Sequence, residues 1–194
     1  MTQKEKVIEL LKKNHGVIRS KTLAENNIHR QYLKQLLDEG SIVQVARGLY
    51  VLPSTSVDDY YLGTYTYKNA IYSHSTALYF HGLTDRTPMM LDVTFPSNVR
   101  IDNFLLNPHY INKERFEIGV MTMTNSKGFE IKVYDLERTI CDIIRDRNKI
   151  DTQIFNDALK GYMKRKDKNL NLLYEYAKKF GILKIVKTYL EVLA

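Results

Sequence analysis

The sequence predicts an α+β protein with an N-terminal winged helix-turn-helix, a mixed domain with antiparallel strands, and a helical C-terminal part. Within residues 1–53 the apolar spacing is helical three times and then changes to the two-residue period of strands. Beyond residue 54, strand-like and helical segments alternate to about residue 150, and residues 151–194 read as two or three amphipathic helices. The polar break after Pro53 therefore divides the chain into domains 1–53 and 54–194.

The first two helices of residues 1–53 are predicted from capping residues and apolar stripes. In "TQKEKVIELLKKN", Thr2 and Glu5 have the spacing of a capping box, and the apolar stripe consists of Val7, Ile8 and Leu11. After a short extended segment at residues 17–18, Ser20 is expected to cap a second helix. The pair Asn26-Asn27 supplies the turn that follows it.

The third helix and a hairpin complete this domain. The segment "HRQYLKQLLDEG" is expected to bury Leu33, Leu36 and Leu37 and to end at Gly40. "SIVQVARGLYVLP" then alternates as two strands around a turn at Arg47-Gly48. Three helices followed by a two-stranded wing are the order of a winged helix-turn-helix, whose third helix enters the major groove of DNA.

Charge and helix geometry indicate which residues would contact DNA. The net charge of +7 is uneven: residues 1–53 have nine basic and five acidic residues, residues 54–140 eight and ten, and residues 141–194 twelve and seven. With the leucines inside, the residues predicted to bind DNA are His29, Arg30, Gln31, Lys34, Gln35 and, at the wing tip, Arg47. Arginine and glutamine can read base edges, and lysine suits a phosphate. The alternative is a solvated face or a protein-docking module.

The segment "SHSTALYFHGLTDR" contains two histidines seven residues apart. Ser73 is expected to cap a helix from His74 to His81, and Gly82 to end it. Histidines at this spacing lie about 10.5 Å apart along a helix, too far to share one zinc ion. Since Ser73, Ser75 and Asp85 are only generic partners for catalysis, we expect structural or partner-contact roles, with no catalytic residue, cofactor or metal. Arg86 completes the motif.

The segment "VYDLERTICDIIRDR" predicts a helix capped by Asp135, with an ion pair between Arg138 and Asp142. The carboxylates Asp135, Glu137, Asp142 and Asp146 raise the alternative of a metal-dependent nuclease. Glu137 and Asp146 are instead expected at the helix start and on its solvated face. The basic run 164–168 is expected to be an exposed helix end, with a phosphate contact as the alternative.

Strands are expected elsewhere in the second domain. "LDVTFP" and "FEIGVMTMTNSKGFEIKVYD" have strand composition, and the turn at residues 125–128 predicts antiparallel pairing. "DDYYLGTYTYKNAIY" is expected to be strand and loop. One cysteine, no signal-peptide pattern and no long apolar run predict a soluble, cytoplasmic protein without membrane contact.

These segments together resemble the AbiEi family, the antitoxin and transcriptional-regulator component of AbiE-type toxin–antitoxin and phage-resistance (abortive infection) systems. The resemblance rests on "HGVIRSKTLAE", "HRQYLKQLLDEG", "VARGLYVLP" and the two blocks described above. It implies binding to inverted repeats in the protein's own promoter, and an antitoxin domain beyond about residue 54. It also implies type IV action against an AbiEii-type nucleotidyltransferase toxin, without a stable complex.

The leading interpretation is thus a non-enzymatic autorepressor and antitoxin. The main alternative is a nucleic-acid- or nucleotide-processing enzyme with its site in residues 73–146. A ligand-responsive regulator is a third interpretation, although the sequence has no recognisable small-molecule motif.

Overall fold

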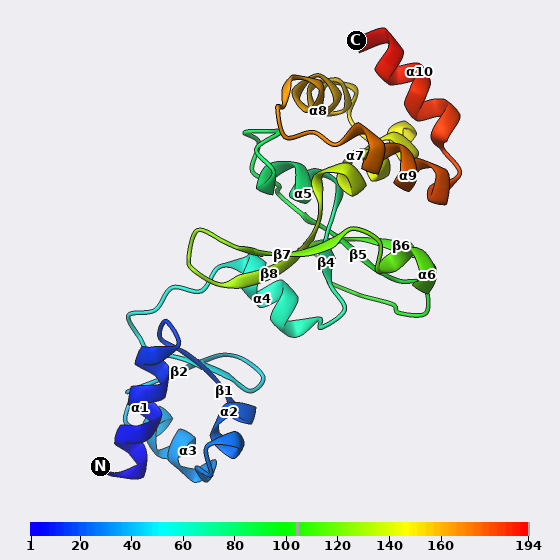
Figure 1. Ribbon diagram of the computed structural model, residues 1–194. Helices are drawn as coiled ribbons and strands as arrows, with labels where there is room; N and C mark the ends of the chain where they lie inside the picture. Colours follow the sequence, from blue (N-terminus) through cyan, green and yellow to red (C-terminus); the bar gives the residue numbers. More distant parts are fainter. Residues whose placement is uncertain (104, 194) are drawn as a thin grey trace. The chain divides into compact units, whose positions relative to one another are not determined.

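The computed structural model describes residues 1–103 and 105–193, which form two compact units (Figure 1). The first unit comprises Met1–Thr66 and Thr124–Phe129. The second comprises Tyr67–Met123 and the chain from Glu130 onward. Both units combine helices with a sheet, so the predicted α+β class is confirmed.

The first unit has four helices and a three-stranded sheet among its described residues. The sheet has the order β1-β3-β2, and both pairings are antiparallel. In chain order the elements are α1 (Gln3–Lys13), β1 (Val17–Arg19), α2 (Ser20–Glu25), α3 (Gln31–Asp38), β2 (Val43–Ala46), β3 (Leu49–Val51) and α4 (Asp59–Thr66).

Local signals account for most of this unit. The capping box at Thr2 and Glu5 is present, and α1 buries Val7 and Leu11 against the apolar faces of α2 and α3. The predicted cap at Ser20 is wrong: Arg19 holds the N-cap position of α2, and no side chain caps the helix. The Ser20 amide instead donates to the carbonyl of Gly48 at 2.8 Å, which ties α2 to the turn between β2 and β3.

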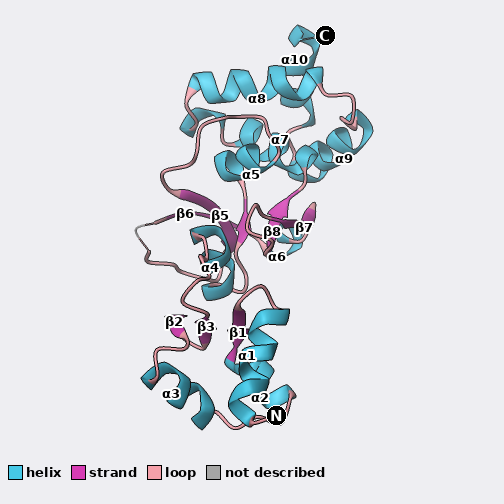
Figure 2. Ribbon diagram, turned by 90° about the vertical axis from the view of Figure 1, so that its left-hand side faces the viewer, coloured by secondary structure: helices cyan, strands magenta, loops and turns pink. Residues whose placement is uncertain are grey.

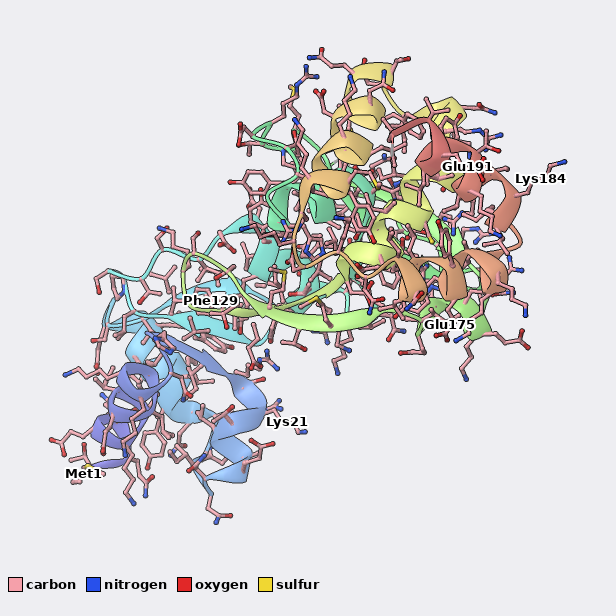
Figure 3. The ribbon with its side chains drawn as sticks, turned by 45° about the horizontal axis from the view of Figure 1, so that its top comes forward. Met1, Lys21, Phe129, Glu175, Lys184 and Glu191 are labelled. Carbon is pink, nitrogen blue, oxygen red and sulfur yellow. The ribbon has the colours of Figure 1, made fainter. Side chains whose placement is uncertain are left out.

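Residues 59–66 form helix α4. The prediction of strand and loop for the tyrosine-rich segment is therefore wrong for these residues. Tyr61 is buried and stacks on Phe129, labelled in Figure 3, with 4.4 Å between ring centroids. Both rings pack on Leu49 and Val51 of β3. This packing overrides the strand preference of the aromatic residues. The first compact unit therefore extends to Thr66. The division at residue 53 stays a prediction about function.

The second unit is built on a five-stranded sheet with the order β6-β5-β4-β8-β7. Its strands are β4 (Ile71–Tyr72), β5 (Leu91–Pro96), β6 (Leu106–Ile111), β7 (Val120–Thr124) and β8 (Glu130–Tyr134). β4 pairs antiparallel with β5, whereas β5–β6 and β4–β8 are parallel, so the sheet is mixed. The connection between β7 and β8 is too short for a parallel crossover, which makes that pair the expected antiparallel hairpin.

Helices gather on one side of this sheet (Figure 2). They are α5 (His74–Phe80), α7 (Leu136–Arg145), α8 (Thr152–Lys164), α9 (Leu170–Phe180) and α10 (Leu183–Leu193), with short α6 (Lys113–Phe116) beside β6. Their core centres on Ile140, Ile143 and Ile144 of α7, which are fully buried. The prediction of C-terminal amphipathic helices is confirmed. None of the described helices has both the length and the apolar character needed to cross a membrane.

Candidate nucleic-acid interface and a buried histidine cluster

The outer face of α3 presents the residues that the sequence predicts for DNA binding. Leu33 and Leu36 are buried, and Tyr32 and Leu37 are half-buried against the same core, which turns the polar side chains of the helix outward. All six predicted residues are exposed: His29, Arg30, Gln31, Lys34, Gln35 and Arg47. The first two precede the helix, whose first residue is Gln31. Nδ1 of His29 accepts a hydrogen bond from the Gln31 amide at 3.2 Å, which orders the approach to α3.

The turn of the β2–β3 hairpin is anchored by its backbone, so the Arg47 side chain remains free to extend. Gly48 has φ +75°, a conformation that favours glycine. The hydroxyl of Tyr65 donates to the Arg47 carbonyl at 3.3 Å, and Ser20 holds the Gly48 carbonyl.

Four of the five carboxylates of residues 1–53 have an ion-pair or hydrogen-bond partner, whereas Asp38 lies exposed on α3, four residues after Lys34 and on the same face. Glu39 pairs with Lys4, Glu9 with Lys13 at 3.0 Å, and Glu25 with Lys21 at 3.5 Å. Glu5 accepts from the Thr2 amide in the capping box. By contrast, none of Arg30, Lys34 and Arg47 forms an ion pair with any residue that the structure describes. The excess positive charge of the first unit is therefore available to an external anion.

In the second unit, the block that begins at Ser73 lies inside the protein. Ser73 occupies the N-cap position of α5 but makes no capping bond, contrary to the prediction. Its hydroxyl oxygen instead accepts from Thr94 at 2.9 Å and lies 3.0 Å from Nδ1 of His74. His74 is 2% exposed and has φ +45°, a left-handed conformation that is unusual for a non-glycine residue.

His74 belongs to a cluster of two imidazoles and two carboxylates. Its Nε2 lies 3.0 Å from Oδ2 of Asp146, just beyond α7, and its ring stacks on that of His109 from β6, with 3.6 Å between centroids and 15° between planes. Nε2 of His109 lies 2.7 Å from Oδ1 of Asp92 on β5. Since Nε2 of His74 faces a carboxylate that only accepts, the neutral ring carries its proton there, and the Ser73 hydroxyl donates to Nδ1.

Both carboxylates of this cluster are stabilised in their ionised form. The hydrogen bond with His74 and the neighbouring Arg145 hold the pKa of Asp146 well below its usual range, although burial opposes this. Burial alone would raise the pKa of Asp92, but the hydrogen bond and charge interaction with His109, together with His74 and Asn107, outweigh it, and the pKa is lowered. Asp146 is thus a half-buried cluster member and not, as expected from the sequence, part of a solvated helix face.

The second histidine of the block has a different place. Nε2 of His81 lies 2.7 Å from the carbonyl of Tyr134, and burial lowers the pKa of His81. Gly82 ends α5 with φ +65°, and Leu83 returns its amide to the Leu78 carbonyl at 2.9 Å, as expected for a Schellman end. Asp85 and Arg86 are exposed, and Arg86 donates to Gln153 at 2.9 Å.

The predicted ion pair between Arg138 and Asp142 is present and fully buried. Nε of Arg138 donates to Asp142 at 3.0 Å, while Nη1 donates to the carbonyls of Arg115 and Ile118 at 2.8 and 2.6 Å. The guanidinium also lies over the rings of Tyr134 and Phe180, at 3.8 and 4.4 Å from their centroids. The Arg138 side chain therefore connects helix α7 to the chain segment that precedes β7.

The remaining carboxylates of this block have structural partners. Asp135 caps α7 through the Arg138 amide at 2.7 Å and accepts from the Tyr176 hydroxyl at 2.9 Å. Glu137, expected at the helix start, lies in the first turn of α7, is 6% exposed and accepts from the Asn169 amide and from the Tyr162 hydroxyl. Because these carboxylates cap helices and cross-link them, they do not form the open acidic cluster that a metal-dependent nuclease requires.

Sequence reasoning found only part of the histidine cluster. It singled out Ser73 and His74, and weighed Asp146 in the nuclease alternative, but it missed Asp92, Thr94 and His109. The missing signal is strand register: β5 and β6 are parallel, with Thr94 opposite His109. A parallel pairing between two short strands leaves no periodic mark that identifies the facing residues.

Comparison with known proteins gives three findings. A family model described as "Transcriptional regulator, AbiEi antitoxin" matches residues 5–53, and no curated protein matches significantly. The crystal structure of the RV2827C protein from Mycobacterium tuberculosis is similar, with a TM-score of 0.56 and 14% identity, covering 92% of this chain and 72% of that one. At this identity the likeness concerns the fold alone. The resemblance to the AbiEi family of antitoxin transcriptional regulators is thus confirmed by the family model over residues 5–53.

Proposed function

We propose that the protein is a non-enzymatic transcriptional autorepressor and antitoxin that binds double-stranded DNA through residues 1–53. The observation that carries the proposal is the outer face of α3, where Arg30 and Lys34 are exposed and unpaired among the described residues, with Arg47 likewise unpaired at the hairpin turn. Unpaired arginine and lysine side chains at a helix and at a hairpin turn are the residue types that contact phosphates and base edges of a duplex.

The order of elements in the first unit supports a winged helix-turn-helix. Helices α1, α2 and α3 precede the β2–β3 hairpin, and β1 adds a third strand beside β3. In this arrangement α3 is the recognition helix and the hairpin is the wing. Arg30, Gln31, Lys34 and Gln35 then read base edges or hold phosphates, His29 lies at the helix entrance, and Arg47 contacts the backbone or the minor groove.

The DNA target proposed is a set of inverted repeats in the protein's own promoter. Residues 54–194 would form the antitoxin domain, with an AbiEii-type nucleotidyltransferase toxin as functional partner and no stable complex between them. The description of the matching family as an antitoxin and transcriptional regulator supports this pairing.

Point substitutions in the full chain test the two roles separately. A truncation after residue 53 would remove α4 from the first unit and expose the apolar surface that Tyr61 covers. We therefore expect Arg30→Ala with Lys34→Ala to abolish repression of a promoter–reporter fusion, while growth protection against the co-expressed toxin persists. Loss of both activities in a folded variant, or retention of repression, would contradict the division of function.

A further inference from the structure

We propose that His74, His109 and Asp146 bind one divalent transition-metal ion, for which Zn²⁺ is the appropriate probe. These residues come from the start of α5, from β6 and from the end of α7. One ligand atom from each lies within 4.8 Å of the others, and the three side chains are buried or half-buried. Two imidazoles and one carboxylate are a usual ligand set for zinc and for divalent iron.

The other nitrogen of each imidazole is held by an outer partner, as in established metal sites. Asp92 holds Nε2 of His109 at 2.7 Å, which leaves Nδ1 for an ion. Asp92 is in turn fixed by Asn107 at 2.7 Å and by the Ser75 amide at 3.2 Å. Carboxylates that accept from a ligating histidine fix its tautomer and orientation and strengthen the ligand.

Coordination by His74 requires an exchange of tautomer. Its Nε2, now directed at Asp146, would give up its proton to bind the ion, and the ring would carry a proton on Nδ1 instead. The Ser73 oxygen, 3.0 Å from Nδ1, can accept a hydrogen bond from this N–H group because a hydroxyl has two lone pairs and Thr94 uses only one. The backbone of His74 has φ +45°, a strained conformation that persists only where surrounding contacts hold the residue in place.

The local charge favours a cation at this point. Asp92 and Asp146 contribute two negative charges, against the single guanidinium of Arg145, which is shared with Asp142. A divalent ion would therefore relieve an excess of negative charge at a site of low solvent access.

Binding requires a modest rearrangement. Ligands on a tetrahedral zinc ion lie about 3.3 Å apart, so the ligand atoms would have to close in by about 1.5 Å at most. The imidazoles would also splay beyond their 15° angle, because a nitrogen lone pair lies in the plane of its ring. His109, whose side chain is 24% exposed, has the freedom to rotate. Three protein ligands would leave a coordination position for water.

The test uses the untagged full chain, stripped with chelator, dialysed against Zn²⁺ and measured by elemental analysis and isothermal titration calorimetry. We expect one zinc per chain and a higher melting temperature. His109→Ala and Asp146→Asn should each abolish stoichiometric uptake, and Asp92→Asn should weaken it by about 10- to 100-fold. His15→Asn, which removes an exposed histidine of the first unit, is the matched control and should leave uptake unchanged.

A second measurement, on the unmodified protein, tests the metal site even if a variant fails to fold. Co²⁺ added to the unmodified protein should give the intense visible absorption of a site with nitrogen ligands and low symmetry. The proposal is overturned by a Co²⁺ spectrum identical to that of the free ion, by zinc uptake that does not saturate at one equivalent, or by uptake that a folded His109→Ala variant retains. Neither metal uptake nor the Co²⁺ spectrum depends on promoter binding. A negative result for the metal site therefore says nothing against the proposed DNA-binding role.

Discussion

The two units use their charged residues in opposite ways. In the first unit, Arg30, Lys34 and Arg47 point into solvent, and the apolar stripes of short helices determine that direction. In the second, Arg138, Asp142 and His74 are almost completely buried. Arg138 and Asp142 pair within α7, Arg138 also donates to the carbonyls of residues 115 and 118, and His74 lies 3.0 Å from Asp146. The first unit thus offers its charge to an outside ligand, whereas the second uses charge to connect its own elements.

The largest effect is expected from removing the buried guanidinium of the second unit. Arg138→Ala leaves Asp142 fully buried with one cation fewer and frees two backbone carbonyls. Breaking a buried ion pair in this way should lower the free energy of unfolding by about 3–5 kcal/mol. Urea denaturation followed by circular dichroism measures it. Exposed Arg86→Ala is the control, expected within about 0.5 kcal/mol of wild type; similar destabilisation of both variants would remove the contrast between the units.

The next effect concerns the boundary of the first unit. Phe129 is 7% exposed and stacks on Tyr61, so Phe129→Ala should destabilise the first unit by about 3 kcal/mol. Promoter affinity should decline as this unit melts, at a temperature where the second unit stays folded. Lys127→Ala, in the exposed turn before it, is the matched control. Unchanged melting of the DNA-binding unit in Phe129→Ala would show that residues 124–129 do not contribute to it.

A smaller, pH-dependent effect is expected at His81. Burial lowers its pKa from the ordinary value near 6.5, and the neighbouring Asp135 and Glu137 only partly offset this. The unfolded chain therefore binds a proton more readily than the folded one, and stability should fall as the pH decreases below about 6.5. His81→Asn should remove this part of the pH dependence in urea titrations between about pH 7 and 5. An identical pH profile in the variant would contradict a buried, neutral His81.

The sequence predicts the first unit well because its signals are local. The capping box at Thr2, the leucines of α3 and the turn at Gly48 each specify structure within a few residues. The helical form of residues 59–66 could not be predicted, because it depends on Phe129, some sixty residues later. For the same reason only part of the histidine cluster could be predicted from the sequence. His109 and Asp92 come close to His74 through strand pairing, which no local sequence pattern encodes.

The central claim is that the exposed cations around α3, and not basic charge in general, bind the promoter. The direct test compares the full-length wild type with the triple variant Arg30→Ala, Lys34→Ala, Arg47→Ala, by fluorescence anisotropy on a promoter duplex across a series of salt concentrations. We expect binding to weaken by about 1–3 kcal/mol for each side chain that reads a base, and the salt slope to fall by about one for each side chain that holds a phosphate. A triple variant with the same charge change, Lys12→Ala, Lys13→Ala, Lys21→Ala, should bind nearly as wild type. Equally weakened binding by the two triple variants, or wild-type affinity and slope in the first, would contradict the account.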